Sequence, residues 1–462
     1  MEFGIIYTWA YSIIMLVAVF VVGFLIARAP FVRKFYLPTA LISGLILLAL
    51  GPQIMGQFNP EFQLSGAFYD VWRGAPKILI NVVFACLFIA HPMMPIKKIW
   101  KVAGPQVTFG QMLAWGQYLV AGLVTMLVLI PIFKMPEVTA AILEISFEGG
   151  HGTVAGMSEV FSKFNFESGQ DVANGLATAS LVSSLFFGLI LIHWAKKCGQ
   201  LRPGGVVKIA RNKVYYQKII HDLHKKGVRL RDYLTFGRVA TNLTIVAAGV
   251  GMGFLLHAGL SQLEDLTWAR IGVKIMPFLP HFTFCMVGGI MVGEFVRKIG
   301  IEISRTVVDL ISAIALSGLI MTAIGTMNLS FLSSDFAVFA ILYLTGTIWL
   351  LGCFVILARK MFAEYWFQNA IISFGQSMGM TATGLLFAQM VDPKNRTNAV
   401  ESFGYKQLLF EPLMGGGIVT ALSMPIISIV GLQIFTLICG IITFAWMLAG
   451  LFYFGRKGGN KW

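Results

Sequence analysis

Long apolar runs recur along the whole chain, and two of them are interrupted by short, polar, glycine-rich segments. A run of about 20 apolar residues is long enough to cross the ~30 Å hydrocarbon core of a bilayer as a helix. The interruptions, Glu148–Thr153 and Gly375–Gly384, fall at matching places in the two halves of the chain. Irregular backbone at membrane depth is tolerated only where it lines a cavity or is buried in protein. The pattern therefore predicts an all-α integral membrane protein whose two interruptions mark a transporter binding site.

We expect eleven crossing helices and two interrupted segments. The first run follows Glu2 rather than a basic region, and no small-residue cleavage site follows it, so we interpret it as a retained span rather than a signal peptide. The crossing helices are expected at residues 5–27, 38–55, 77–94, 105–132, 172–195, 239–259, 273–293, 305–327, 335–358, 408–430 and 433–454, and the interrupted segments at 137–165 and 365–391.

Composition and charge agree with a membrane protein. The chain is 57% hydrophobic and 12% charged, whereas soluble domains carry about 25% charged residues. The net charge of +14 is concentrated in places, with twelve Lys and Arg residues between Lys196 and Arg238. A basic loop between spans is typical of the cytoplasmic side of a membrane protein, so we expect no nucleic-acid partner.

The side of each loop follows from these basic clusters. All of them fall in the cytoplasm if both interrupted segments return to the side from which they enter, which places the N-terminus outside and the C-terminus inside the inner (plasma) membrane. The two halves then have opposite orientations. We therefore expect two inverted-topology repeats of about five spans each, with one re-entrant or broken-helix segment per repeat and one extra C-terminal span. The repeats are residues 1–195 and 239–430, the basic cytoplasmic linker is 196–238, and the extra span with its basic tail is 431–462.

Residue patterns support the duplication and suggest a role for the linker. Leu37-Pro38 opens the second span, and Leu279-Pro280 opens its counterpart in the second half. Within the linker, apolar residues recur at helical spacing among Lys and His, which predicts a helix lying on the cytoplasmic surface. Its apolar residues are Tyr216, Ile219, Ile220 and Leu223.

The interrupted segments carry groups that suit an anion and a cation. Glycine leaves backbone amides and carbonyls uncovered, and amides at a half-helix N-terminus suit a substrate carboxylate, whereas free carbonyls suit Na⁺. An alternative is that these small residues only allow close helix packing. The expected substrate-binding residues are Gly150, His151, Gly152, Thr153, Ser377, Gly379, Thr381 and Thr383, and the candidate Na⁺ ligands are Glu148, Thr153, Thr383 and Glu411.

Several acidic residues lie near these segments. Glu144 and Glu148 are four residues apart, which would place them on one face of a helix. Acidic side chains inside a membrane are costly and usually functional, although Glu148 at the mouth of the segment would be solvated in the alternative interpretation. Asp309 is a further candidate for the same reason. Asn81 and His91 are interpreted as hydrogen-bonded residues of the helix bundle.

At these residues the chain resembles the sodium/glutamate symporter family of bacteria. Gly149-Gly-His-Gly-Thr153, followed by Ser158 and Phe161, is similar to the Gly-Gly-His-Gly-Thr motif of that family. Gly379-Met-Thr-Ala-Thr383 is similar to its Gly-x-Thr-x-Thr stretch, and Leu37-Pro38 through Gly44 is similar to its second span. The resemblance runs in order over about residues 1–435 and is low outside the motifs.

The resemblance implies Na⁺-coupled uptake of glutamate by a homodimer of inverted repeats, with a moving transport unit beside a fixed scaffold. The chain departs from the family pattern at several places. Glu144 and Glu148 stand where small or hydroxyl residues are expected, and Gln376-Ser377 replaces a His-containing stretch. Extra acid beside an anion site repels glutamate unless a cation or proton intervenes.

The sequence therefore predicts a secondary active transporter that carries glutamate or a related small anionic amino acid together with Na⁺ by alternating access, in an elevator-like manner. Transport of another small carboxylate, or coupling to H⁺, is the alternative. A membrane-embedded enzyme would belong to a different class; no His-Glu-x-x-His, paired-acid or Ser/Lys signature supports it, so we expect no enzyme activity. A channel is disfavoured because one site between two repeats suits alternating access.

Overall fold

The structure is a computed structural model that describes residues 2–30, 32, 37–59, 64, 67–89, 96–201, 234–267, 276–329, 331–392 and 397–455. Helices make up most of these residues, and no strand occurs among them. The chain forms two compact units, each assembled from separated stretches of sequence. Unit 1 comprises Met1–Met93, His151–Asn174 and Ile219–Ser333, and unit 2 comprises Met94–Gly150, Gly175–Lys218 and Ser334–Trp462.

Within the described residues, nine helices are long and apolar enough to cross a membrane. They confirm that the chain is an all-α protein of the multi-pass membrane type. The nine spans are Tyr7–Arg28, Thr39–Phe58, Phe68–Ile89, Val102–Phe133, Glu167–Lys197, Phe236–Leu266, Arg305–Gly325, Phe336–Met361 and Leu432–Phe454.

Two of the eleven expected crossing helices are not among the nine. The helix expected at 273–293 is α14 (His281–Lys298), which begins after Pro280 and carries Glu294, Arg297 and Lys298 in its last turns, so its apolar stretch is short. The prediction of one continuous helix at 408–430 is wrong. The chain leaves the helix after Phe410 and resumes at Ile418, because Pro412 and three successive glycines follow Glu411.

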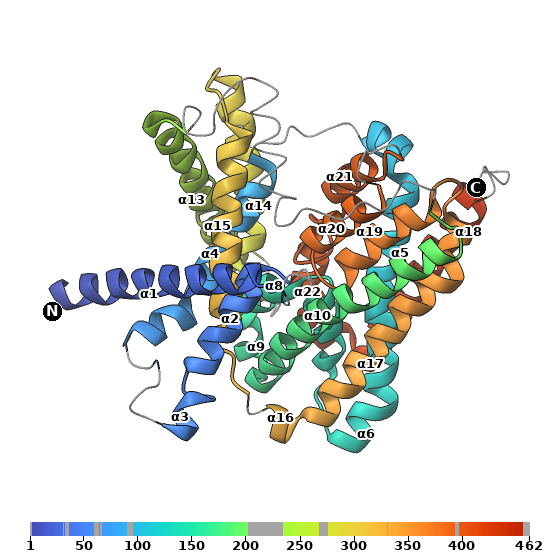
Figure 1. The fold of residues 1–462 in the computed structure, drawn as a ribbon, viewed down its shortest axis with the longest axis horizontal. Coiled ribbons are helices and arrows are strands. Elements are labelled where there is room, and N and C mark those ends of the chain that lie inside the picture. Colours follow the sequence, from blue (N-terminus) through green and yellow to red (C-terminus); the bar gives the residue numbers. More distant parts are fainter. Residues whose placement is uncertain are drawn as a thin grey trace. The chain divides into compact units, whose positions relative to one another are not determined.

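Unit 1 is built around four helices that pack side by side (Figure 1). Helix α4 (Ala67–Ile89) packs against α14 and α15 (Arg305–Gly325), and α14 also packs against α13 (Phe236–Leu266). Small residues allow the backbones to approach closely, since a Cβ at Gly289 would lie 2.2 Å from the Ala85 carbonyl oxygen. The helices of unit 1 include α1 (Glu2–Arg28), α2 (Thr39–Leu50), α3 (Met55–Phe58), α4 (Ala67–Ile89), α9 (Ser158–Lys163), α13 (Phe236–Leu266), the 3₁₀ turn η5 (Met276–Phe278), α14 and α15 (Arg305–Gly325).

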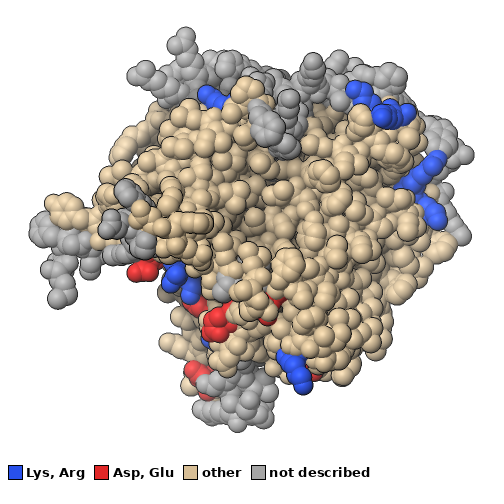
Figure 2. All heavy atoms as spheres, turned by 60° about the horizontal axis from the view of Figure 1, so that its bottom comes forward, with Lys and Arg blue, Asp and Glu red and all other residues tan. Residues whose placement is uncertain are grey.

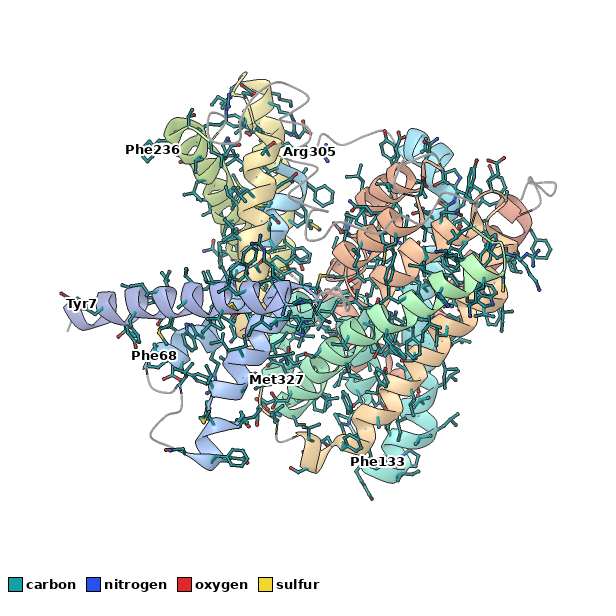
Figure 3. The ribbon with its side chains drawn as sticks, in the orientation of Figure 1. Tyr7, Phe68, Phe133, Phe236, Arg305 and Met327 are labelled. Carbon is teal, nitrogen blue, oxygen red and sulfur yellow. The ribbon has the colours of Figure 1, made fainter. Side chains whose placement is uncertain are left out.

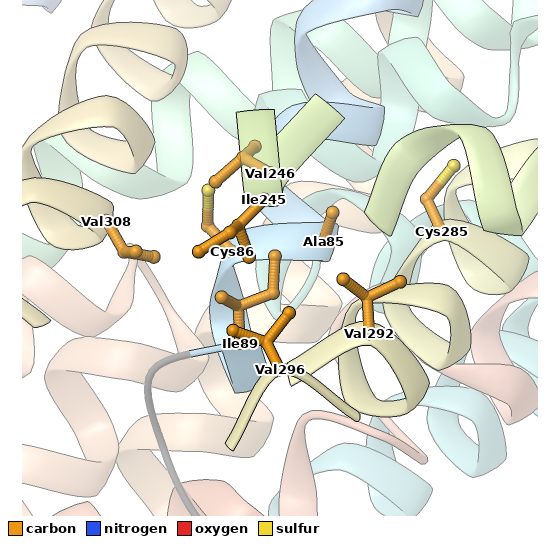
Figure 4. Close-up of a cluster of buried hydrophobic side chains, with 9 residues drawn as sticks. All are labelled: Ala85, Cys86, Ile89, Ile245, Val246, Cys285, Val292, Val296 and Val308. Atoms are coloured by element: carbon orange, nitrogen blue, oxygen red, sulfur yellow. The ribbon is translucent and has the colours of Figure 1, made fainter. Parts of the chain in front are cut away.

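An apolar core joins these helices, as Figure 4 shows. Its buried residues are Ala85, Cys86, Ile89, Ile245, Val246, Cys285, Val292, Val296 and Val308. A second cluster ties α1 and α2 to α4, where the Trp72 indole donates to the Ser12 carbonyl at 3.1 Å. Away from these cores the side chains project outward, as Tyr7 and Phe236 do in Figure 3. Their exposed fractions are 70% and 90%.

Unit 2 is organised around the long helix α5 (Ile96–Val124). This helix packs against α17 (Phe336–Gly352), α19 (Trp366–Ser377), α21 (Ala399–Phe410) and α23 (Leu432–Leu448). Gly116 allows one of these contacts, since the Trp349 ring occupies the place of its missing Cβ and the Trp349 indole donates to the Leu113 carbonyl at 3.0 Å. The other elements are the π-helix η2 (Thr125–Leu129), α6 (Ile130–Phe133), the 3₁₀ helix η3 (Glu137–Ala141), α7 (Ile142–Phe147), most of α10 (Glu167–Lys197), α17 (Phe336–Gly352), the π-helix η6 (Cys353–Ala358), α18 (Arg359–Met361), α19 (Trp366–Ser377), α20 (Thr381–Val391), α21 (Ala399–Phe410), α22 (Ile418–Val430), α23 (Leu432–Leu448) and the π-helix η7 (Ala449–Phe454).

Both predicted interruptions are real breaks in helices. In the first segment α7 ends at Phe147 and α8 (Gly150–Gly156) begins after Glu148 and Gly149. Gly150 has a φ of +67°, a conformation that favours glycine. In the second segment α19 ends at Ser377 and α20 begins at Thr381.

The boundaries of the predicted repeats differ in kind from those of the compact units, because each unit takes helices from both halves of the sequence. The inverted repeat itself stays a prediction. Residues 202–233, which hold most of the basic linker and its expected surface helix, lie outside the described residues, as do the basic tail from residue 456 and His91.

The surface of the described residues is largely uncharged. On the face drawn in Figure 2, most described atoms belong to residues other than Lys, Arg, Asp and Glu. Large apolar side chains on the expected spans are exposed, including Leu127 (72%), Leu255 (68%) and Ile348 (69%). A soluble protein rarely presents so much apolar surface, so these helices suit a lipid environment.

Candidate functional site

The two predicted interruptions meet inside unit 2. A Cβ built on Gly150 would lie 3.8 Å from the carbonyl oxygen of Gly379, so the break in the first segment is adjacent to the break in the second. The Gly379 backbone is itself surrounded by polar atoms, since its own missing Cβ would lie 2.9 Å from the Gly375 carbonyl and 3.1 Å from the Thr383 hydroxyl. The two helix breaks therefore lie side by side, with polar atoms of Gly375 and Thr383 next to Gly379.

Helix α5 fixes the end of α19. The last carbonyls of a helix lack partners within it. The Gln117 amide, on α5, donates to the Ser377 carbonyl in the last turn of α19 at 3.1 Å, and the Gln106 amide, three turns earlier on α5, donates to Asn369 in the first turn of α19 at 2.6 Å. Both glutamines are fully buried, so these hydrogen bonds form where water does not compete. One side-chain hydrogen bond from α5 therefore holds α19 at the break, and another holds it at its opposite end.

Glu144 joins the first segment to a third break, between α21 and α22. Its buried carboxylate accepts hydrogen bonds from the Tyr118 hydroxyl at 2.5 Å, the Thr420 hydroxyl at 2.9 Å and the Gly415 amide at 3.0 Å. Gly415 has a φ of +67°, and a Cβ there would lie 3.4 Å from the Glu148 carbonyl oxygen. Three hydrogen bonds satisfy Glu144, so it has a structural role in this arrangement.

Glu411 lies at the start of α20. Its carboxylate accepts from the Gln407 amide at 2.6 Å and from the Thr381 hydroxyl at 3.4 Å, and Gln407 also donates to Thr381 at 3.1 Å. The positive end of a helix dipole favours such an anion. The predicted substrate residue Thr381 and the predicted Na⁺ ligand Glu411 are therefore direct partners.

A fully buried lysine, Lys406, lies within the same unit. Its ammonium group donates to the Gln376 side chain at 2.5 Å and lies 4.0 Å from the centre of the Phe410 ring. Gly110 provides the room, since a Cβ there would lie 2.4 Å from Cε and 2.7 Å from Nζ of Lys406. Buried lysines are rare and are normally paired or functional.

Glu148 differs from the other two acids. Its side chain is 6% exposed, and neither carboxylate oxygen has a hydrogen-bond partner among the described residues. Ser377 lies beside Glu148, but its hydroxyl does not reach hydrogen-bond geometry and is also without a partner. An ionised carboxylate buried without partners is strongly destabilised, so this group requires a cation or a proton.

The predicted residues His151, Gly152 and Thr153 belong to unit 1, because the chain passes from unit 2 to unit 1 after Gly150. His151 and Thr153 are 3% and 1% exposed. A Cβ at Gly152 would lie 2.9 Å from Ile80. In contrast to the polar surroundings of Gly379, the neighbours of Gly152 are apolar side chains. These three residues therefore belong to a different unit from the polar groups around Gly379.

A cavity of about 430 Å³ opens in unit 1 just beyond this segment. Ala155 and Ser158, which follow Thr153 in the chain, contribute to its lining. Groups of both charges also line it: Arg73, Lys77, Glu167 and Asp171. Its volume and its mixed charge suit a small zwitterion.

The remaining candidates have ordinary partners. The Asn81 amide donates to the Lys77 carbonyl at 3.0 Å, as expected for a bundle residue. Asp309 forms an ion pair of 3.8 Å with Arg305, so it does not stand as an isolated intramembrane acid.

Lys406 and Tyr118 were not among the residues that the sequence singled out, and Gln376 was noted only as a departure from the family pattern. Lys406 was placed outside the span expected at 408–430, among polar neighbours typical of an exposed helix end. A signal was present, because Phe403 and Phe410 lie on the same helical face as Lys406.

The fold and this arrangement define a multi-pass, all-helical membrane protein whose second unit holds three helix breaks around buried charged side chains. A comparison with protein-family models finds no match, and neither does a comparison with curated proteins.

Proposed function

We propose that the protein is a secondary active transporter that moves glutamate or a related small anionic amino acid together with Na⁺. One observation carries the proposal: the breaks of the two interrupted segments are adjacent at Gly150 and Gly379, with buried carboxylates beside them. Half-helix ends of this kind provide amides for a substrate carboxylate and oxygen ligands for a cation.

The oxygen atoms present fit Na⁺. Within the described part of the chain, neither the Glu148 carboxylate nor the Ser377 hydroxyl has a hydrogen-bond partner, and hard cations prefer such oxygen ligands. Glu148 and Ser377 would hold the Na⁺, whose positive charge would offset that of Glu148 and favour a substrate anion near the breaks. Glu144 and Glu411 already have hydrogen-bond donors, so they are less suited as direct ligands.

Other observations support parts of the proposal. The division into two compact units, each drawn from both halves, supports an elevator-like alternating access in which one unit moves. The homodimer, the inner-membrane location and the external N-terminus rest on the resemblance and on the basic loops.

Coupling to H⁺, or transport of another small carboxylate, is the second candidate. Glu148 favours this candidate, because the described residues provide no hydrogen-bond donor to its buried carboxylate and a proton would remove its charge as effectively as a bound cation would offset it. The two candidates share one site and differ in the ion that completes it.

Uptake of radiolabelled glutamate into proteoliposomes tests the proposal, with an inward Na⁺ gradient, an inward H⁺ gradient, or neither. We expect uptake only with the Na⁺ gradient. Uptake driven by the H⁺ gradient alone, or uptake of a radiolabelled dicarboxylate in place of glutamate, would support the second candidate. The absence of uptake of both labelled compounds with every gradient would contradict both candidates. Liposomes without protein are the control.

A further inference from the structure

The neighbouring residues fit both the aliphatic stem and the ammonium group of Lys406. Its stem passes over the space left open by Gly110, and its ammonium group is held by the Gln376 side chain and by the Phe410 ring. A cation over the face of an aromatic ring is attracted by the ring electrons. These contacts are neutral, so they hold the ammonium group without cancelling its charge.

Glu148 and Lys406 lie beside consecutive residues of α19. Gln376 binds the ammonium group of Lys406, and Ser377 lies beside Glu148. The charge of Lys406 acts on both Glu148 and Glu411. A lysine stem is long and flexible. A change of rotamer therefore brings the ammonium group toward the unpartnered carboxylate.

We propose that Lys406 is a tethered cation that competes with a free monovalent cation for the Glu148 carboxylate. In the structure, Lys406 contacts Gln376 and Phe410, and among the described residues neither buried oxygen of Glu148 has a hydrogen-bond partner. When that cation leaves, Lys406 moves to Glu148 and neutralises it. The inference rests on the proposed function only in naming Na⁺ as the free cation.

The geometry makes two substitutions act in opposite directions. Lys406→Met removes the competing charge but keeps an apolar stem of similar length, so Na⁺ binds more tightly. Gly110→Ala places a Cβ within 2.7 Å of Nζ, at the flexible end of the lysine, and displaces it from its present place. Displacement favours the pairing of Lys406 with Glu148, so Na⁺ binds more weakly.

The test measures Na⁺ binding by the thermal unfolding midpoint of the purified protein, with NaCl replaced stepwise by choline chloride at constant ionic strength. A ligand that binds only the folded protein stabilises it by RT ln(1 + L/Kd) at free ligand concentration L, so the dependence of the midpoint on Na⁺ concentration gives the dissociation constant. We expect the apparent dissociation constant for Na⁺ to fall at least tenfold in Lys406→Met and to rise severalfold in Gly110→Ala. Glu148→Gln should abolish the Na⁺ effect in either background.

Lys196→Met and Glu364→Gln are matched controls, because both side chains are exposed, and they should behave as the wild type. A dissociation constant within twofold of the wild type in Lys406→Met would overturn the inference, as would no Na⁺ effect in both proteins. If Lys406→Met does not fold, Na⁺ binding in Gly110→Ala that is unchanged or tighter than in the wild type would overturn the inference. Because the assay measures binding alone, a protein that passes it but transports no glutamate refutes the proposed function and leaves this inference intact.

Discussion

The clearest structural prediction concerns Tyr118→Phe. The hydroxyl of Tyr118 donates to the fully buried Glu144 carboxylate at 2.5 Å, while its ring packs edge-on against Phe435 with the ring centres 5.5 Å apart. The substitution removes the donor and keeps the ring, so packing is unchanged. Glu144 retains Thr420 and the Gly415 amide as donors.

The cost follows from the kind of hydrogen bond lost. A hydrogen bond to a charged group is worth about 1.5–3 kcal/mol in proteins generally, whereas hydrogen bonds between membrane helices average about 0.6 and reach about 1.7 kcal/mol. The two ranges meet at ~1.5 kcal/mol. For a cooperative unit of roughly 200 residues this lowers the unfolding midpoint by about 3–6 °C.

Thermal unfolding of the purified protein in one detergent is the assay. Tyr11→Phe is the control, because the Tyr11 side chain is 51% exposed and its hydroxyl is not expected to contribute. A second arm repeats Tyr118→Phe in a Glu144→Gln background, where its effect should shrink if the hydroxyl acts through Glu144. A midpoint equal to that of Tyr11→Phe, or an undiminished effect in the second arm, would refute the reasoning.

Two further predictions concern glycines. Gly289→Val should lower the yield of folded protein, because its new Cβ would lie 2.2 Å from the Ala85 carbonyl oxygen and would push α14 away from α4. Gly251→Val is the control and should fold normally, because no atom lies within 4 Å of the added Cβ. Identical size-exclusion profiles for the two variants would contradict the close packing. Gly379→Val should abolish substrate uptake in proteoliposomes, because its side chain would enter the polar surroundings of the break, whereas Gly152→Val would press on Ile80 and should act through packing. Normal uptake in Gly379→Val would make Gly379 a packing residue as well.

The sequence indicated the breaks that glycine and polar residues impose on an apolar run. Glu148–Gly150 and the residues around Gly379 stand out because they lie inside long apolar stretches. The third break, after Glu411, was missed because the apolar residues on both sides satisfied the length of a span. Pro412 and Gly415 signalled it, and their local backbone preference outweighed hydropathy.

The partners of the buried charges were not predictable in the same way. Tyr118 and Glu144 are 26 residues apart, and Gly415 is 271 residues from Glu144, so only the packing of helices distant in sequence brings them together. Lys406 has the sequence context of a helix end exposed to water. Its burial depends on Gly110, on a different helix, which leaves room for the side chain.

The central claim is that a cation gradient drives substrate against its own gradient. Its most direct test is the steady-state ratio of internal to external glutamate in proteoliposomes with a tenfold inward Na⁺ gradient and the membrane potential clamped at zero. Because a tenfold gradient stores about 1.4 kcal/mol per ion, the account predicts accumulation of up to about tenfold for each coupled Na⁺. Glu148→Gln should lose this accumulation. A ratio of one in the wild type, with the gradient present, would contradict the account.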